Sequence, residues 1–420
     1  MNSRQRVLTA LDHRQPDRVP VDLGATAVTG MHCSIVAALR DHYQLERRPV
    51  KLCEPYQMLG LVEDDLQRAI GVDAEGIFRG NTIFGFPAEE FKPWFAPWGQ
   101  DLLVPELFNT TTGGDGSIYL YPQGDTSIPP SGQMPAGGYF FDAIVRQEPI
   151  DEDRLDVRDN LEEFGPLDAG LLERIVDGVK AAAKTGRAVV LWTPGTALGD
   201  IALVPATFLK HPKGIRSVEE WYLSIAMRPK YIESIFRKQV EIALANLAAI
   251  NDACGNLIDV AFTCGTDFGT QNSQFCSVAT FGALWLEHYR AINDWIHAHT
   301  KWKTGKHSCG AVAPFIDSFI EAGFDILNPV QCSAAGMEER ALKERFGQRI
   351  TFWGGGVDTQ RVLPFGTPEQ VRRQVRQRLE IFSPHGGFVF NAIHNVQART
   401  PIENVVAMIE AVRQFNGAAR

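Results

Sequence analysis

The sequence places a histidine and a cysteine two residues apart, His307 and Cys309, at the end of a short segment expected to be a β-strand. Residues i and i+2 of a strand point to the same side, so both side chains can face one space. Imidazole nitrogen and thiolate sulfur are ligands of Zn²⁺, and a catalytic zinc site has three protein ligands and one open position. The pair therefore predicts two-thirds of a zinc site. A structural histidine beside a buried thiol is the alternative that the pattern leaves open.

A third zinc ligand has two candidates. His394, after the last predicted strand, is the first, and Cys332, after an earlier strand, is the second. The chain has seven cysteines, and an odd number in a long chain without a recognisable signal peptide indicates reduced thiols and a cytoplasmic location.

Other polar groups near strand ends are candidates for catalysis and substrate binding. Asp267 lies in a glycine-flanked loop and Asp358 follows three glycines, and either carboxylate could act as a general acid or base. The structural alternatives are an Asx turn for Asp267 and a loop that needs positive φ for Asp358. The candidates for neutral hydrogen bonds to a substrate are Gln271, Asn328, Gln331, Gln360, Asn391, Asn395 and Gln397.

These groups need a scaffold that brings strand ends together. Apolar segments near residues 19, 75, 188, 257, 304, 325, 350 and 388 predict eight strands. Strands that alternate with helices indicate a parallel sheet covered by helices, and eight of them indicate an α/β fold, the (β/α)8 TIM barrel. A doubly wound open sheet is the alternative, which the lack of a glycine-rich nucleotide motif after any strand disfavours. Active sites of barrels lie at the C-terminal ends of the strands.

Helical periodicity accounts for the segments between the strands. We expect helices at 3–12, 32–43, 60–70, 167–184, 228–250, 278–299, 311–322, 338–346, 367–382 and 401–415. Residues 80–150 are rich in glycine, proline and aromatic residues, which predicts β-hairpins and loops. We therefore predict one barrel domain over 1–420 with an insertion at about 80–150. Two roles suit that insertion: it covers the barrel mouth, or it contacts a partner subunit in a homodimer.

Composition and charge narrow the range of partners. The 420 residues are 45% hydrophobic and 22% charged, with a net charge of -9. This balance argues against nucleic-acid and anionic-membrane partners. No apolar stretch approaches the ~20 residues of a membrane span, and residues 1–6 lead into a charged helix rather than a signal peptide. We expect a cytoplasmic enzyme with a small-molecule substrate.

The motifs together resemble the uroporphyrinogen decarboxylase (URO-D) superfamily, especially its cobalamin-dependent methyltransferase branch. The resembling stretches extend over nearly the whole chain: 6–11, 16–21, 267–271, 307–310, 328–331, 354–358 and 400–404. The resemblance implies a (β/α)8 barrel. It also implies methyl transfer between a corrinoid, either methylcobalamin or a corrinoid protein, and a small thiol, methoxy or methylamine-type substrate.

The resemblance also implies a ligand set for zinc. In the methyltransferase branch a His-x-Cys motif and a cysteine on the last strand bind the metal. The corresponding positions here are His307, Cys309 and His394, so a histidine replaces the family's second cysteine. One thiolate instead of two would leave zinc a stronger Lewis acid.

Two other functions stay open at this point. The first is a lyase, a decarboxylase of the uroporphyrinogen type that acts on a small carboxylate. Those decarboxylases hold their substrate with arginines after the first strand, whereas residues 24–28 here contain none. The second is a non-catalytic corrinoid- or tetrapyrrole-binding protein, which would bind cobalamin tightly without turnover.

Overall fold

The computed structural model of the chain describes residues 1–161 and 165–418. Its central sheet consists of parallel strands that follow one another in chain order, each paired with the next. They are β3 (Ala74–Gly76), β10 (Ala188–Trp192), β11 (Val260–Cys264), β12 (Lys303–His307), β13 (Ile326–Asn328), β14 (Thr351–Trp353) and β15 (Phe388–Val389).

The two edges of this sheet meet at Val21. Val21 forms a parallel bridge with Phe390 just after β15, and its carbonyl oxygen accepts the N–H of Asp73 just before β3 at 2.7 Å. The segment around Val21 therefore occupies an eighth strand position and closes the sheet. This confirms the predicted (β/α)8 barrel and excludes the doubly wound open sheet.

The inside of the barrel is filled with apolar side chains. Inward-facing positions alternate along the strands with positions that face the outer helices, and Gly305 leaves room for the Phe262 ring, which a Cβ at that position would approach to 2.9 Å. Val7 and Leu11 of α1 (Ser3–Leu11) pack against this interior from the end at which the strands begin. The opposite end, where the strands finish, is called the mouth below.

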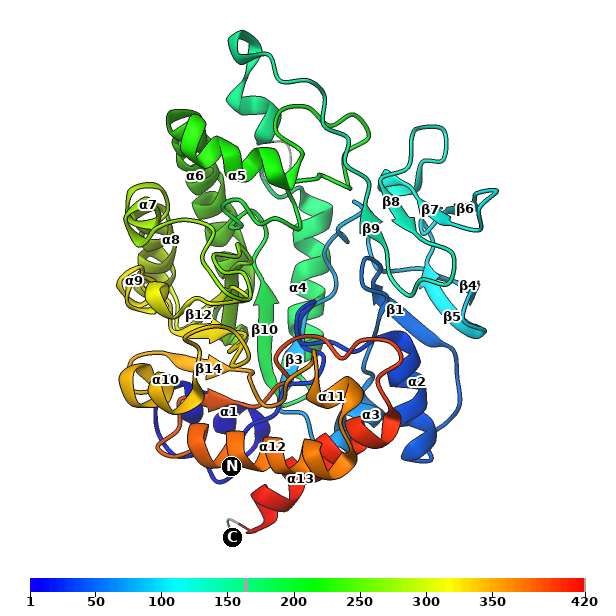
Figure 1. Cartoon of the computed structure of the whole chain (residues 1–420), viewed down its shortest axis with the longest axis vertical. Helices are drawn as coiled ribbons and strands as arrows, with labels where there is room; N and C mark the ends of the chain where they lie inside the picture. Colours follow the sequence, from blue (N-terminus) through cyan, green and yellow to red (C-terminus); the bar gives the residue numbers. More distant parts are fainter. Residues whose placement is uncertain (162–164, 419–420) are drawn as a thin grey trace.

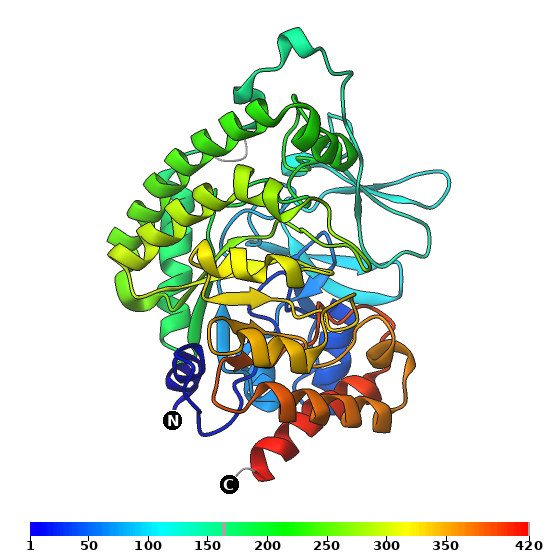
Figure 2. The ribbon, with the colours of Figure 1, turned by 60° about the vertical axis from the view of Figure 1, so that its left-hand side comes forward.

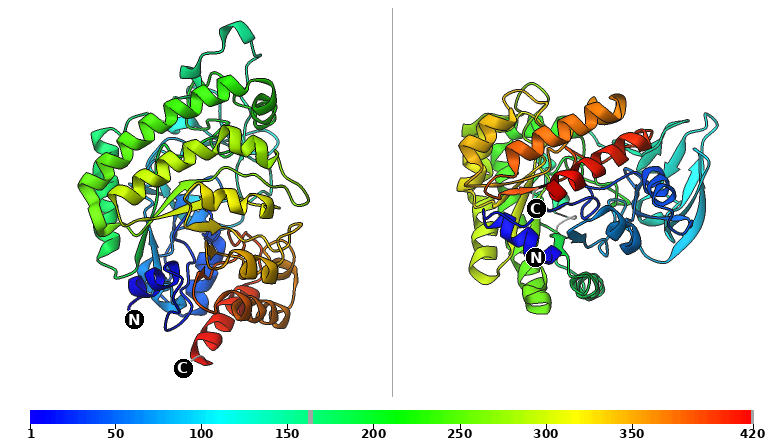
Figure 3. Two further views of the ribbon diagram at one scale, coloured as in Figure 1. Left: turned by 90° about the vertical axis from the view of Figure 1, so that its left-hand side faces the viewer. Right: turned by 90° about the horizontal axis from the view of Figure 1, so that it is seen from below.

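Helices surround the barrel on its outer face. They are α2 (Cys33–His42), α3 (Asp64–Ile70), α4 (Ala169–Ala183), α5 (Val218–Met227), α6 (Pro229–Cys254), α7 (Val278–Leu284), α8 (Leu286–His299), α9 (Ile316–Glu321), α10 (Glu339–Phe346), α11 (Val362–Phe365), α12 (Pro368–Phe382) and α13 (Ile402–Ala418). Figures 1 and 2 show α6, α7, α8 and α9 stacked along one side of the sheet. Both termini lie at the same end of the molecule, as the two views of Figure 3 also show.

Two small sheets stand beside the barrel, on the side away from α6 to α9 (Figure 1). One has the order β2-β1-β5-β4 and the other the order β6-β7-β8-β9. Their strands are β1 (Val50–Glu54), β2 (Leu59–Gly60), β4 (Phe91–Ala96), β5 (Gln100–Pro105), β6 (Thr110–Thr112), β7 (Ile118–Leu120), β8 (Gly132–Met134) and β9 (Asp142–Ala143). The predicted hairpins are present, but β1 pairs with β5, so the small sheets also recruit residues from before position 80.

Several predicted boundaries were wrong for local reasons. The helix predicted at 60–70 begins at Asp64, because Gly60 pairs with β1. The helix predicted at 278–299 is two helices that meet at Trp285. The prediction missed α5, which ends just before Pro229, and a proline can begin a helix but not continue one. The strand predicted at 257–262 begins at Val260, after a 3₁₀ turn.

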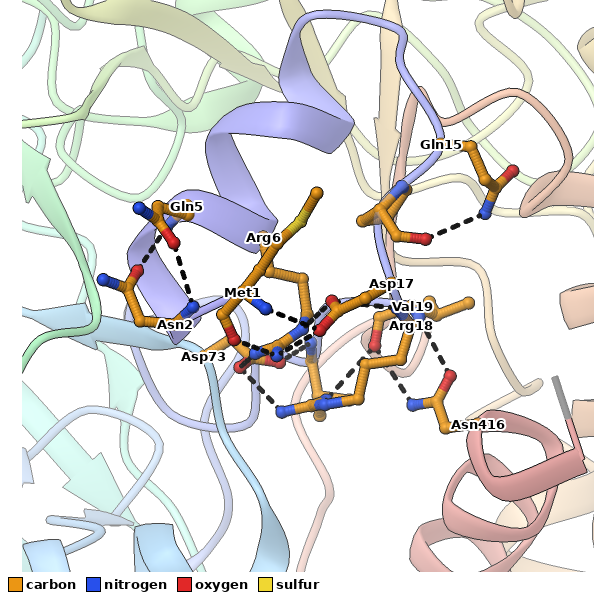
Figure 4. Close-up of polar contacts among 12 residues, drawn as sticks. Met1, Asn2, Gln5, Arg6, Gln15, Asp17, Arg18, Val19, Asp73 and Asn416 are labelled. Carbon is orange, nitrogen blue, oxygen red and sulfur yellow. Dashed lines mark hydrogen bonds and ion pairs between the residues drawn. The ribbon is translucent and has the colours of Figure 1, made fainter. Parts of the chain in front are cut away.

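A buried ion-pair network holds the barrel closure in place (Figure 4). The fully buried Asp73 carboxylate accepts hydrogen bonds from Arg6 at 2.7 Å and from Arg18 at 2.8 Å. Its second oxygen accepts the N–H of Val21 at 3.1 Å. Arg6 also pairs with Asp17 at 2.7 Å. The network therefore links α1, the closing segment and β3.

Replacing Asp73 with asparagine is expected to lower the free energy of unfolding by about 3 kcal/mol, because Arg18 loses its carboxylate partner and the buried Arg6 keeps only Asp17. Urea unfolding followed by circular dichroism measures the change. The control is Asp41→Asn, which removes an exposed pair with Arg47 and should cost less than about 0.5 kcal/mol. Equal losses for the two variants would contradict a structural role for the network.

None of the helices in the described part of the chain combines the length and the apolar character that crossing a membrane requires.

Candidate metal centre

Three candidate ligands meet at the mouth of the barrel. His307 is the last residue of β12, Cys309 follows two residues later, and His394 follows β15. One ligand atom from each lies within 4.8 Å of the other two, and Cys309 Sγ is 3.5 Å from His307 Nε2. The structure thus brings His394 to the pair. Cys332 is not in the group, and its Sγ lies 3.5 Å from the carbonyl oxygen of Val330.

Asn328 sets the orientation of the His307 ring. β12 and β13 pair so that His307 lies opposite Asn328, and Asn328 Oδ1 lies 2.6 Å from His307 Nδ1. The Asn328 amide nitrogen donates to the Trp353 carbonyl oxygen at 2.8 Å, so the amide oxygen is left as the acceptor. Nδ1 therefore carries the proton, and the lone pair of Nε2 points toward Cys309 and His394. Predicted as a substrate amide, Asn328 supports a candidate ligand instead.

The protonation states in the cluster suit metal binding. Burial lowers the pKa of His307 to about 4, and burial together with the nearby His307 lowers the pKa of His394 to about 4. Both imidazoles are therefore neutral at pH 7 and can offer a lone pair. Burial, and then the charge of Asp267, raises the pKa of the Cys309 thiol. A bound cation would reverse that last effect and favour the thiolate.

Asp267 lies beside the cluster and holds the Cys309 loop. Its Oδ1 accepts the backbone N–H of Cys309 at 2.6 Å, and the next residue, Phe268, donates its N–H to Ser308 Oγ at 2.9 Å. Burial raises the pKa of the Asp267 carboxyl. The loop after β11 is thus fastened to the loop after β12, with a carboxylate at the junction.

Gln271 and Gln331, both predicted to bind substrate, bond to each other and to loop backbone. Gln331 Nε2 donates to Gln271 Oε1 at 2.8 Å, and Gln331 Oε1 accepts the N–H of Gly310 at 2.8 Å. Gln271 Nε2 donates to the Ser333 carbonyl oxygen at 2.6 Å. These contacts make the pair a brace between three loops.

The amides at the end of β15 have different surroundings. Asn395 accepts the N–H of Gly30 at 2.6 Å and donates to Ala27 at 2.7 Å, which ties it to the first loop. Asn391 donates to the Asp22 carbonyl oxygen at 2.8 Å, while its buried Oδ1 has no hydrogen-bond partner among the described residues. Gln360 is exposed and Gln397 is half-buried.

Asp358 stabilises a turn. Its Oδ1 accepts the backbone N–H groups of Gln360 at 2.7 Å and of Arg361 at 3.1 Å. In the described ranges, no hydrogen bond joins it to the three candidate ligands. The placement favours the structural alternative over the predicted catalytic role.

Sequence reasoning missed two residues at the mouth. The Trp192 ring, at the end of β10, stacks on Phe262 and lies 6.4 Å from the His307 ring. Asp200, eight residues beyond β10, is buried, and burial raises its pKa to about 6. The sequence signal for Asp200 was a carboxylate in the loop that follows a barrel strand. Because Asp200 lies eight residues beyond the strand end, it was not selected as a candidate.

Lys306 occupies the opposite face of β12 from the metal candidates. Its fully buried ammonium group donates to the carbonyl oxygens of Thr266 at 2.5 Å and His307 at 2.8 Å. It also lies 4.9 Å from the centre of the Phe268 ring. Lys306 therefore fastens the loop after β11 to the end of β12 from behind the site.

Known proteins resemble this chain in sequence and in fold. The family model described as Uroporphyrinogen decarboxylase (URO-D) matches residues 205–415, half of the chain, including all three candidate ligands. The uroporphyrinogen decarboxylase of Methylococcus capsulatus is 33% identical over 104 residues, which cover 25% of this chain and 28% of that protein. The enzyme of the same name from Magnetococcus marinus is 26% identical over 99 residues, 24% of this chain and 26% of its own. In these matches the chain spans about a quarter of the length of the curated relatives.

A solved structure matches over a longer range. The "methyltransferase from Methanosarcina mazei" superimposes with a TM-score of 0.54 at 16% identity, covering 99% of this chain and 99% of the other. At this identity the likeness concerns the fold, which agrees with the closed barrel. With the family model matched across the strands and loops that carry the candidate centre, the chain belongs to the uroporphyrinogen decarboxylase family.

Proposed function

We propose that the chain is a zinc-dependent methyltransferase that moves a methyl group between a corrinoid and a small thiol, methoxy or methylamine-type substrate. The observation that carries the proposal is the convergence of His307, Cys309 and His394 from two strand ends onto one point. Three protein ligands at the open end of a barrel are the donor set of a catalytic zinc site, with the fourth position left for a substrate atom.

The donor set fits zinc in spacing as well as in type. A nitrogen and a sulfur ligand of a tetrahedral zinc ion lie about 3.5 Å apart, given usual Zn–N and Zn–S bond lengths. The separation of His307 Nε2 and Cys309 Sγ is 3.5 Å. Asn328 supplies the outer hydrogen bond that zinc-binding histidines commonly make, which fixes the ring and its tautomer.

The chain's own residues would divide the work as follows. His307, Cys309 and His394 hold the metal, which when bound lowers the pKa of the substrate heteroatom and keeps a nucleophile available at neutral pH. Asp267 stands where it can position or protonate the reacting group. The Gln271–Gln331 brace keeps the loops around the site in register.

The methyl carrier enters as part of the same proposal. A corrinoid, either free cobalamin or the cofactor of a corrinoid protein, would give the methyl group to the substrate or take it from one. The direction of transfer does not alter the demand on the protein residues, because the same substrate heteroatom would attack the methyl group in one direction and leave it in the other.

Metal removal tests this proposal directly. The purified protein is expected to contain about one zinc ion per chain by elemental analysis, and its methylcobalamin:thiol methyltransferase activity should disappear on chelation. Activity should return when zinc is added back, but not when magnesium is added, because thiolate and imidazole ligands favour zinc. Full methyl transfer by the metal-free protein would overturn the proposal.

A decarboxylase is the second candidate function, favoured by the name that the curated relatives carry. It would release CO2 from a small carboxylate without metal or corrinoid. Residues 22–30, after the first strand position, contain no arginine or lysine to hold such a substrate. Measuring CO2 release from chelated protein separates the two functions.

A further inference from the structure

The segments that follow the barrel strands have an unusual charge composition. Directly after the strand ends, seven of the eight contain no lysine or arginine, although basic residues follow farther along three of these loops, and aspartates follow the strands at four places, Asp22, Asp200, Asp267 and Asp358. These basic-free segments are 22–30, 193–200, 265–277, 308–314, 329–337, 354–360 and 390–398. Because these segments begin at the mouth, fixed charge near the candidate metal centre is mostly negative.

Two of the four aspartates are occupied by structural contacts. Asp22 accepts the Trp353 indole N–H at 2.9 Å and the Ala25 N–H at 2.9 Å, and Asp358 holds its own turn. Asp267 accepts the Cys309 backbone N–H with one of its two oxygens. Asp200 Oδ2, like the second oxygens of Asp267 and Asp358, has no hydrogen bond among the described residues, and the Asp200 side chain is buried.

The free oxygen of Asp200 lies beside an aromatic ring at the mouth. Asp200 Oδ1 accepts the N–H of Ala202 at 2.9 Å. A Cβ built on Gly265 would collide with Asp200 Oδ2 and lie 3.1 Å from the Trp192 ring. The glycine therefore allows the carboxylate to approach the end of β11, next to a ring that is itself 6.4 Å from His307.

Asp200 and Asp267 act on the same neighbour. Burial, and then the negative charges of Asp267 and Asp200, raises the pKa of the Tyr222 hydroxyl, which lies 3.3 Å from the Asp267 carbonyl oxygen. Lys306 offsets part of this charge, but its ammonium group is bonded to two backbone carbonyls behind the strand and does not face the substrate.

A second, independent observation, an unpaired acceptor oxygen on Asn391, also favours a positively charged or hydrogen-bond-donating ligand. Asn391 Oδ1 is buried at the end of β15, three residues before His394, with no hydrogen-bond partner among the described residues. Its amide nitrogen is already committed to Asp22, so only an acceptor is on offer. Asp200 Oδ2 and Asn391 Oδ1 are thus both acceptors, which call for a donor or a cation, whereas the unpaired hydroxyls of Thr263 and Ser333 can donate as well as accept.

We propose that the substrate carries an ammonium group, bound by Asp200 beside the Trp192 ring, in addition to the thiol or other heteroatom that reaches the metal. This inference rests on the proposed function and specifies its substrate class as an amine-bearing thiol or ether. A cation next to a carboxylate and an indole gains from both the charge and the ring. A carboxylate in the place of the ammonium group would be repelled by the charge of Asp200.

Three thiols of matched length test the charge preference: cysteamine, 2-mercaptoethanol and 3-mercaptopropionate. Protein loaded with Co²⁺ in place of zinc reports thiolate binding as a change in its visible absorption spectrum, without turnover. We expect cysteamine to bind about tenfold or more tightly than 2-mercaptoethanol, and 3-mercaptopropionate to bind weakest. Asp200→Asn should weaken cysteamine binding about tenfold and leave 2-mercaptoethanol binding unchanged. Asp252→Asn, an exposed change of the same charge at the far end of the barrel, should alter neither.

The neutral thiol separates failure of this inference from failure of the proposed function. If 2-mercaptoethanol changes the cobalt spectrum but the three thiols bind equally, or if 3-mercaptopropionate binds best, the ammonium inference is overturned and the metal centre stands. If no thiol changes the spectrum, the metal site as a thiol-binding centre is overturned, and this inference falls with it.

Discussion

Replacing Cys309 with alanine is expected to remove zinc from the purified protein and to abolish methyl transfer. Apparent binding free energies of zinc sites are on the order of 10–16 kcal/mol for four ligands, so one thiolate contributes about 3 kcal/mol, or roughly a hundredfold in Kd. The loss also leaves a site with two neutral imidazoles and no anionic ligand. Elemental analysis and a competitive zinc-chelator titration measure the effect, and circular dichroism should show an unchanged fold, because Cys309 is only partly buried.

Cys332→Ala is the matched control for this substitution. The Cys332 thiol also follows a barrel strand, but burial raises its pKa to about 12 and it lies outside the three-ligand cluster. The variant should therefore keep its zinc and its activity. Zinc lost from Cys332→Ala but kept in Cys309→Ala would show that the ligand set has been assigned to the wrong cysteine.

The barrel could be predicted from sequence because the repeating pattern is carried by many residues at once. Each apolar strand segment and each helical stripe contributes independently, so an error at one boundary does not alter the order of elements. The closing contact was less visible. The sequence predicts a strand near residue 19, but the pairing itself is short, a single bridge between Val21 and Phe390, and no periodicity indicates which strands such a short segment joins.

The candidate site was predictable where residue type determines the chemistry, and unpredictable where geometry does. His307 and Cys309 indicate metal binding because imidazole nitrogen and thiolate sulfur are zinc ligands. Asn328 looks like a free amide in the sequence, and only the β12–β13 register places it opposite His307. Asp200 lies in a long loop, where nothing in the sequence fixes its approach to Gly265. The brace between Gln271 and Gln331 likewise depends on loops that no local pattern positions.

His394→Ala is expected to lower zinc affinity about a hundredfold, because it removes the only ligand supplied from the end of β15. His394→Cys should recover much of this affinity, since a thiolate is also a good zinc ligand. The two variants differ in charge, however. Zinc with two thiolates carries one positive charge less than zinc with one, so it lowers the pKa of the substrate thiol less strongly.

The charge difference gives His394→Cys a distinct pH dependence. The transfer rate follows the fraction of substrate present as thiolate, so a higher pKa of the bound thiol moves the rise of the rate to higher pH. The zinc-loaded variant should therefore be slower than the unaltered protein near pH 7 and approach it in alkaline solution. Rates are compared at full zinc occupancy, which separates Lewis acidity from metal loss. An unshifted profile in a zinc-replete variant would mean that residue 394 is not bound to the metal that activates the thiol.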